Sequence, residues 1–314
     1  MRIFKGRLRS ISAAARAMGV GAMLLGAAGC SVRGMAEAVF VGDHFTRTAD
    51  VAYGADPRLK LDVYRPKRVR PGAPVVVWLY GGRWQEGSKR DYRLLADGMT
   101  RRGWIVIVPD YRLYPSVTFP AWIQDGAQSV RWARDHAREL GADPANLFVM
   151  GHSAGAHTVA LLALDEHWLR DAGLPANAVR GFVALAGPVA TTWTDVDVQA
   201  LMGPREGWPA TYPLTLIDGT EPPLLLLHGT GDRTVSVENS RRLQAAIRER
   251  GGCARAITYR GVGHVEIAVA LSVPRLNSAP VLGDIARFVR NPRGACTADG
   301  GNGMTVINNT REDG

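Results

Sequence analysis

Hydrophobic positions along the chain fall into short runs that are separated by polar, glycine-rich stretches. Five runs are almost continuously apolar, which is typical of parallel strands covered on both faces. These runs lie at residues 74–80, 104–109, 146–150, 181–186 and 223–228. Two further strands are expected: residues 59–64 alternate between apolar and polar, as a half-exposed strand does, and residues 254–259 form the last one.

Between the strands, apolar residues recur in steps of three and four, which predicts amphipathic helices. The clearest of these helices spans residues 123–140 and ends at Gly141. Further helices are expected at residues 91–102, 154–164, 238–250 and 281–289. Strands that alternate with helices, without an internal repeat, predict an α/β fold: one domain with a mostly parallel, doubly wound sheet flanked by helices.

The first 29 residues have the composition of an export signal. They carry five basic residues and no acidic one, and their apolar run at residues 18–29 is too short to cross a bilayer as a helix. The sequence Ala27-Ala28-Gly29-Cys30 resembles the lipobox of bacterial lipoproteins, which implies lipidation of Cys30 after cleavage. Ser31 then favours the outer membrane, so we expect an exported, lipid-anchored protein that faces the periplasm. Ordinary cleavage among small residues, with Cys30 incidental, is the alternative.

The net charge of +9 would suggest a nucleic-acid partner, but most of it belongs to the expected signal. Five of the 38 basic residues and none of the 29 acidic ones fall in the first 29 positions, so the remainder carries +4. The remaining charges are scattered, apart from a short cluster at Lys67, Arg68 and Arg70. We therefore expect no nucleic-acid partner.

The patterns divide the chain into four parts. Residues 1–29 are the expected signal peptide and residues 30–50 a tether. Residues 51–292 are the expected folded domain, within which residues 188–222 have little regular pattern. Residues 293–314 are rich in Gly and Asn and are expected to be a loose tail.

If Cys30 carries lipid, two cysteines remain, Cys253 and Cys296. An even pair in an oxidising compartment predicts a disulfide, and two free thiols are the alternative. No cluster has the spacing of metal ligands, so we expect neither a metal site nor a cofactor.

The candidate chemistry starts at Gly151-His152-Ser153-Ala154-Gly155, which joins an expected strand to an expected helix. In such a G-x-S-x-G pattern the glycines permit a sharp turn that projects the serine hydroxyl above the sheet. The N–H of Ala154 begins the helix, where it can stabilise an oxyanion. Ser153 is therefore the candidate nucleophile.

A serine needs a base, and His264 is the best placed of the seven histidines. It lies in a glycine-rich loop after the last expected strand, at the carboxyl edge where sites of such sheets gather. Asp232 follows the preceding strand at the same edge, and its carboxylate can orient the imidazole. The order Ser153, Asp232, His264 is that of the α/β-hydrolases. Three rivals of Asp232 lie in an irregular stretch before that strand: Asp195, Asp197 and Asp218.

Tyr80-Gly81-Gly82-Arg83-Trp84 occupies the loop that should complete an oxyanion hole. Together with the triad order, it makes residues 59–289 resemble an α/β-hydrolase of the carboxylesterase type. This branch includes hormone-sensitive-lipase-like esterases, feruloyl-esterase-like proteins and kynurenine formamidases. It carries H-G-G-x-W at this loop, and this chain has Tyr80 in place of the His but keeps Gly81, Gly82 and Trp84. The resemblance implies that the N–H groups of Gly82 and Arg83 are oxyanion donors beside Ala154. Three nearby charged residues are expected to be structural: Asp110, Arg112 and Asp125.

The resemblance implies hydrolysis of a small-molecule, short-acyl ester through an acyl-enzyme on Ser153. Amide or formamide hydrolysis is a close alternative, and a binding lipoprotein that has lost its activity is an alternative of another class. Specificity is expected in residues 188–222, whose aromatic residues could wall an acyl pocket, form a small lid, or pack into the core under a surface loop. The large side chains of this segment are Trp193, Met202, Trp208 and Tyr212.

Overall fold

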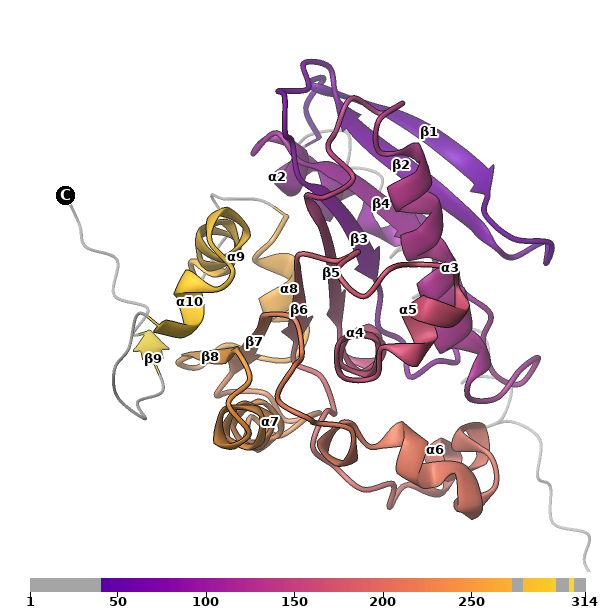
Figure 1. Ribbon diagram of the computed structural model, residues 1–314, viewed down its shortest axis with the longest axis vertical. Helices are drawn as coiled ribbons and strands as arrows, with labels where there is room; N and C mark the ends of the chain where they lie inside the picture. The colour runs from indigo at the N-terminus through magenta and orange to yellow at the C-terminus, as the bar shows by residue number, and fades with distance from the viewer. Residues whose placement is uncertain (1–40, 273–278, 298–304, 308–314) are drawn as a thin grey trace, which may run out of the picture. The chain divides into compact units, whose positions relative to one another are not determined.

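The computed structural model describes residues 41–272, 279–297 and 305–307 (Figure 1). The chain divides between Val41 and Gly42 into two units, and every element described below belongs to the second. The expected signal peptide, Cys30 and most of the expected tether lie outside the described residues, so export and lipidation stay predictions. In the described ranges no helix is long and apolar enough to cross a membrane.

The described strands form one sheet with the order β1-β2-β4-β3-β5-β6-β7-β8-β9. Only β2 runs against the others, because it is antiparallel to both of its neighbours while all other pairs are parallel. The bounds are β1 Phe45–Ala52, β2 Lys60–Pro66, β3 Val75–Leu79, β4 Ile105–Pro109, β5 Leu147–His152, β6 Gly181–Leu185, β7 Leu224–Gly229, β8 Ala254–Tyr259 and β9 Thr305–Ile307. The α/β class and the mostly parallel sheet are confirmed.

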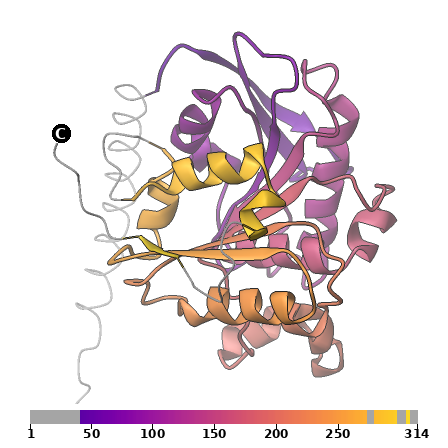
Figure 2. The same cartoon turned by 60° about the vertical axis from the view of Figure 1, so that its left-hand side comes forward.

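Helices cover both faces of this sheet. In Figure 1, α2 and α9 lie on one side of the central strands and α3 and α4 on the other, and Figure 2 shows β8 between α7 and α9. The helix bounds are η1 Lys89–Tyr92, α2 Arg93–Thr100, α3 Ala121–His136, α4 Ala154–Leu164, α5 His167–Asp171, α6 Val196–Met202, η2 Arg205–Thr211, η3 Pro213–Thr215, α7 Glu238–Glu249, α8 Glu266–Val269, α9 Val281–Arg290 and α10 Gly294–Thr297.

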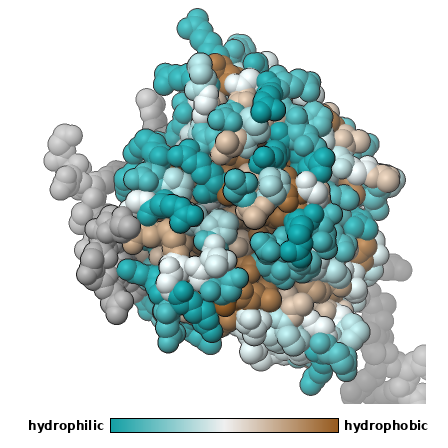
Figure 3. Space-filling view, viewed as in Figure 1, coloured by the Kyte–Doolittle hydropathy of each residue, from teal (hydrophilic) through white to brown (hydrophobic). Residues whose placement is uncertain are grey.

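The five central strands are buried along their whole length, which explains why their sequences show no polar alternation. Every residue of β3, β4, β5, β6 and β7 is buried. Both faces of these strands contact helices, so neither face needs polar side chains. On the face drawn in Figure 3, hydrophobic residues gather mainly in a central strip and hydrophilic residues surround it.

The folded domain extends past both expected boundaries. β1 begins at Phe45, inside the expected tether of residues 30–50, and pairs with β2. Most of its residues are exposed, so this edge strand has no apolar alternation that a sequence pattern could detect. Within the expected loose tail of residues 293–314, α10 forms and β9 pairs with β8. Both expectations differ from the structure because backbone pairing at a sheet edge requires no hydrophobic pattern.

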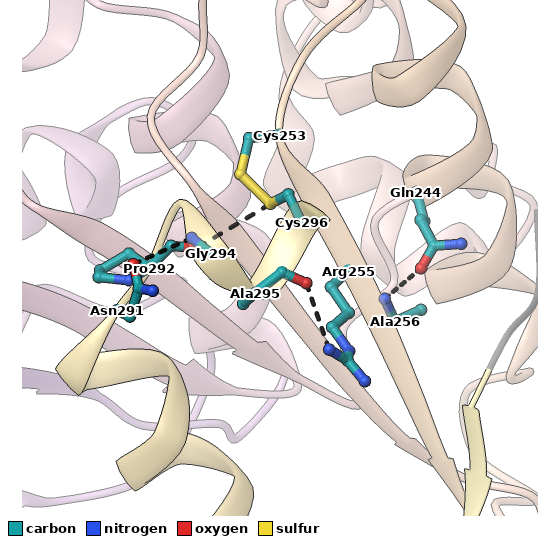
Figure 4. The surroundings of a disulfide bond; sticks show 9 residues. All are labelled: Gln244, Cys253, Arg255, Ala256, Asn291, Pro292, Gly294, Ala295 and Cys296. Atoms are coloured by element: carbon teal, nitrogen blue, oxygen red, sulfur yellow. Dashed lines mark hydrogen bonds between the residues drawn. A yellow bond between two sulfur atoms is a disulfide. The ribbon is translucent and has the colours of Figure 1, made fainter. Parts of the chain in front are cut away.

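The structure joins Cys253 and Cys296 in a disulfide, with 5.5 Å between their Cα atoms (Figure 4). Cys253 directly precedes β8 and Cys296 lies in α10. The guanidinium of Arg255 donates a hydrogen bond of 3.3 Å to the carbonyl of Ala295 beside the bridge. The disulfide therefore holds the start of the tail against the amino end of β8.

Candidate active site

Ser153 lies on a strained turn between β5 and α4, with φ 54° and ψ −119°. A non-glycine residue is rarely stable in this conformation unless its surroundings impose it. The flanking glycines permit the close approach that does so. A Cβ atom on Gly155 would lie 2.1 Å from the carbonyl oxygen of Leu79, and one on Gly151 would lie 2.7 Å from the backbone of Gly155. The serine is thereby held at the carboxyl end of β5.

The structure brings Ser153, His264 and Asp232 into one hydrogen-bonded chain. His264 Nε2 lies 2.9 Å from Ser153 Oγ, and its Nδ1 lies 2.7 Å from Asp232 Oδ2. Because an ionised carboxylate only accepts, Nδ1 is the donor to Asp232 and the neutral imidazole presents Nε2 as an acceptor. The Ser153 hydroxyl therefore donates to the nitrogen that a general base uses.

The side chain of Asp232 is fully buried, yet its carboxyl group is held in the ionised form. Burial raises its pKa, but the hydrogen bonds it accepts outweigh this effect and hold the pKa below its ordinary value. These bonds come from His228, from the N–H groups of Val235 and Thr234, and from His264. A carboxylate fixed in this way orients the imidazole and stabilises the imidazolium form.

Two further histidines, which the sequence analysis did not assign to the site, hold the triad residues in place. His152 donates from Nε2 to the carbonyl of His264 over 2.8 Å, and burial, then the charge of His264, lowers its pKa to about 4. His228 has its Nε2 atom 3.3 Å from Asp232 Oδ2 and its Nδ1 atom 2.8 Å from the hydroxyl of Ser240. In the sequence, the one indication that these histidines belong to the site is their position at the carboxyl ends of β5 and β7.

The glycine-rich loop after β3 lies against the nucleophile. A Cβ atom on Gly81 would lie 3.0 Å from Ser153 Cβ, and the Gly82 carbonyl accepts hydrogen bonds from the N–H groups of Gln85 and Glu86. Gly82 has φ 121° and Arg83 has φ 53°, so the loop turns tightly at these two residues. Arg83 and Ala154 line one cavity together with Ser153. The roles of Gly82, Arg83 and Ala154 as oxyanion donors stay predictions.

Tyr80, which replaces the histidine of the expected H-G-G-x-W pattern, anchors this loop through its phenol. The hydroxyl donates to Asp110 Oδ1 over 2.8 Å and accepts from Arg58 over 3.3 Å. The ring is fully buried and stacks on Tyr111 at 4.5 Å and Tyr92 at 5.5 Å. The substitution therefore leaves the loop with supporting hydrogen bonds, and Asp110 has the structural contact that we expected.

A cavity of about 200 Å³ opens beside Ser153. Trp84, Trp193 and Val198 supply apolar lining, and four threonines supply hydroxyl groups or methyl groups. Arg83 and Asp195, which also line the cavity, form an ion pair of 2.7 Å whose two side chains are about half exposed. This pair joins the glycine-rich loop after β3 to the segment that precedes α6.

The segment of residues 188–222 is both a cavity wall and part of the core. Trp193 is buried, donates from Nε1 to the hydroxyl of Thr211 over 2.6 Å, and packs edge-on against Trp84. The carbonyl of Thr211 accepts from the fully buried His157 over 2.8 Å, and burial lowers the pKa of His157 to about 4. Trp193 therefore packs in the core and also lines the cavity.

The structure separates the rival acids from the triad. Asp195 pairs with Arg83 and accepts from the N–H of Asp197 at the start of α6, while Asp218 accepts from Thr220. Asp125 accepts hydrogen bonds from the guanidinium of Arg112 on both of its oxygens, which is the structural role expected for this pair. Within the described ranges no group of three His, Cys, Asp or Glu side chains could hold a metal ion.

Comparison with known proteins gives a family match over the centre of the chain. The profile of the BD-FAE family matches residues 61–247. Esterase LipQ of Mycobacterium tuberculosis is 30% identical over 68% of this chain and 55% of its own length. A probable isoprenylcysteine alpha-carbonyl methylesterase of Arabidopsis thaliana, ICMEL1, is 25% identical over 69% of this chain and 50% of its own length. The chain spans about half the length of these curated relatives.

Solved structures show the same fold. Esterase B from Lactobacillus rhamnosis, in a form inhibited by a tributyrin phosphonate, has a TM-score of 0.71 and 19% identity over 91% of this chain and 97% of its own. A truncated carbohydrate esterase from gut microbiota has a TM-score of 0.70 and 20% identity over 80% of this chain and 98% of its own. At these identities the likeness establishes the α/β-hydrolase fold and nothing finer.

Proposed function

The chain belongs to the BD-FAE family and has the α/β-hydrolase fold, and on this basis we propose that it is a serine carboxylic-ester hydrolase acting through an acyl-enzyme. The hydrogen-bonded chain from Ser153 through His264 to Asp232 carries the proposal. Several relatives are named as esterases or methylesterases, which supports ester hydrolysis for this chain.

In the proposed mechanism, Ser153 Oγ attacks the ester carbonyl carbon and its proton moves to His264 Nε2. The N–H groups of Gly82, Arg83 and Ala154 stabilise the oxyanion, and losing one such donor costs about 10²–10³ in rate. His264 then gives the proton to the leaving alkoxide, which departs as the alcohol. A water molecule attacks the acyl-enzyme as His264 takes its proton, and the acid leaves with Ser153 restored.

The substrate of this mechanism has a short acyl group. The cavity beside Ser153 holds about 200 Å³, which is less than the roughly 300–1,000 Å³ of sites for drug-sized ligands. Trp84 and Trp193 form rigid walls, since both indoles are buried and pack against each other. Acetyl to butyryl esters suit a cavity of this kind.

The proposal includes export and lipid anchoring at Cys30, on the strength of the signal-like first 29 residues and the lipobox-like sequence before the cysteine. A Cys30→Ser variant, expressed in a Gram-negative host, should be released from membranes washed at high salt and appear as soluble periplasmic protein. Unchanged membrane attachment of this variant would exclude anchoring through Cys30.

A substrate panel tests the activity. The purified chain should hydrolyse p-nitrophenyl acetate and butyrate, and a fluorophosphonate probe should modify Ser153, as located by mass spectrometry of peptides. Matched ester and formamide substrates with the same aromatic leaving group separate the two hydrolase alternatives. Faster formamide turnover would replace the ester proposal with a formamidase. No turnover and no labelling would leave a binding lipoprotein.

A further inference from the structure

A second cavity, of about 850 Å³, is lined by five cationic side chains and by no aspartate or glutamate among the described residues. Lys67, Arg68 and Arg70 come from the chain just after β2, and Arg101 and Arg102 follow α2. We call these five side chains the basic cluster. The ester hydrolase mechanism uses none of them.

The basic cluster lies at the opposite edge of the sheet from Ser153. Pro66, the last residue of β2, pairs with Phe45, the first residue of β1, and Gly103 lies two residues before β4 begins. These positions mark the amino edge of the parallel strands, whereas Ser153 follows the carboxyl end of β5. At about 3.3 Å per residue, strands of five or six residues separate the two edges by roughly 16–20 Å. The cavity is therefore a separate site.

Nearby acids neutralise only part of this charge. Lys67 forms an ion pair of 2.7 Å with Asp43, and Arg101 forms one of 2.7 Å with Asp97. No carboxylate of the described residues forms an ion pair with the other three members, Arg68, Arg70 and Arg102, all of which are exposed. The pKa of Arg102 is lowered by partial burial and by the positive charge of Arg290, so like charges crowd this edge. Such a surface attracts anions, and guanidinium groups bind phosphate through two parallel hydrogen bonds.

The same edge is where the chain enters the domain. His44 lines the cavity, its Nε2 lies 3.0 Å from the hydroxyl of Thr100, and β1 starts at the next residue. Cys30, the proposed lipid attachment, precedes His44 by fourteen positions. Fourteen residues reach at most about 50 Å when fully extended. This reach exceeds the roughly 16–20 Å between the two edges, so a lipid on Cys30 would bring the domain to the membrane, and the charge of the basic cluster would decide which edge faces it.

We propose that the basic cluster is a docking surface for anionic phospholipid headgroups, which orients the domain with Ser153 facing away from the membrane. Tether and charge have separate roles: a lipid on Cys30 would hold the domain at the membrane, and the basic cluster would orient it against the anionic surface. The phosphate groups of the lipids are the recognised chemistry, and arginine supplies the bidentate donors.

Vesicle binding by residues 42–314 tests the docking surface without the lipid anchor. This fragment contains every described strand and the buried core. It should bind vesicles that contain phosphatidylglycerol, should not bind vesicles of phosphatidylcholine alone, and should dissociate as salt is raised. The triple variant Arg68→Gln, Arg70→Gln, Arg102→Gln should bind roughly 100-fold more weakly, since each basic residue near an anionic surface contributes about fivefold.

The matched control is Arg131→Gln, Arg170→Gln, Arg205→Gln, which removes the same charge from exposed arginines on α3, α5 and η2. It should bind the vesicles as the parent fragment does. Equal weakening by both triple variants, or no binding of the parent fragment to anionic vesicles, would overturn the proposal. Saturable binding of inorganic phosphate without vesicle binding would identify a small-anion site and overturn it too. Circular dichroism melting of each variant establishes its folding, and the single variants, each about fivefold weaker, replace the triple variant if it does not fold.

Discussion

The two edges of the sheet use polar side chains in opposite ways. At the carboxyl edge, Ser153, His264 and Asp232 form a continuous hydrogen-bonded chain, and the carboxylate at its end is fully buried. At the amino edge, Arg68 and Arg70 are exposed and form no ion pair with any described residue. Chemistry requires groups that are preorganised to fractions of an ångström, whereas attraction to a charged surface requires only charge density. One sheet thus supports a rigid site at one edge and an adaptable surface at the other.

Removing the nucleophile should have the largest effect, because it should abolish catalysis at the carboxyl edge and leave vesicle binding at the amino edge unchanged. Ser153→Ala should lower kcat for p-nitrophenyl butyrate by at least about 10³-fold, because the covalent step is lost while the binding groups remain. Vesicle binding should be unchanged. Ser236→Ala, at an exposed serine before α7, is the control and should keep full activity. If Ser153→Ala kept a tenth of the activity, the acyl-enzyme mechanism would be wrong.

Removing the disulfide should lower the stability of the fold and leave catalysis unchanged. Cys253 and Cys296 lie toward the amino edge, and the bridge spans a sequence separation of 43 residues. Replacing both by serine should lower the free energy of unfolding in urea by about 2–4 kcal/mol, through the greater freedom of the unfolded chain. The kcat of the folded variant should stay within about a factor of two, because the bridge lies away from the carboxyl edge that holds Ser153 and substitutions away from a site have small effects. A large loss of kcat with unchanged stability would contradict this assignment.

Mild acid should destabilise the carboxyl edge. The buried His152 and His157 have folded-state pKa values of about 4, below the ordinary 6.5, so the unfolded chain binds their protons first as the pH falls. The stability that these neutral rings contribute is fully present above pH 6.5 and is lost as the pH falls toward 4. Each ring accounts for up to about 3 kcal/mol of this loss. Urea unfolding at a series of pH values measures the slope.

The variant His157→Gln should reduce this pH dependence, and His136→Gln should leave it as it is, since His136 stacks on Trp132 at the surface of α3. Equal slopes for His157→Gln and the parent protein would refute the assignment.

The smallest expected effect concerns the ion pair between Arg83 and Asp195. Asp195→Asn keeps a residue that can cap α6 but removes the charge that holds Arg83 across the cavity wall. The ratio of kcat/KM for an octanoyl ester to that for a butyryl ester should rise by up to about fivefold, in line with the small energy of a half-exposed pair. Asp197→Asn, in the first turn of the same helix, is the control. An unchanged ratio would show that this pair does not limit acyl length.

The sequence by itself determined seven strands of the sheet, β2 to β8, and the three residues of the hydrogen-bonded chain, Ser153, Asp232 and His264. Apolar runs such as those of β3 and β5 are long enough to mark buried strands, and Ser153, Asp232 and His264 follow directly from the ends of such strands. Local spacing and chain order are sufficient for these features, because each depends on only one strand and the turn after it.

Contacts between distant segments were decided only by the tertiary structure. The pairing of β1 and β9 at the sheet edges, the bond from His152 to the His264 carbonyl and the ion pair of Arg83 with Asp195 join residues with no shared pattern. The basic cluster arises in the same way, since Lys67 to Arg70 and Arg101 to Arg102 meet only because β2 ends where β4 begins. Short-range patterns record which face of an element is buried, and they carry no information about which other segment lies against it.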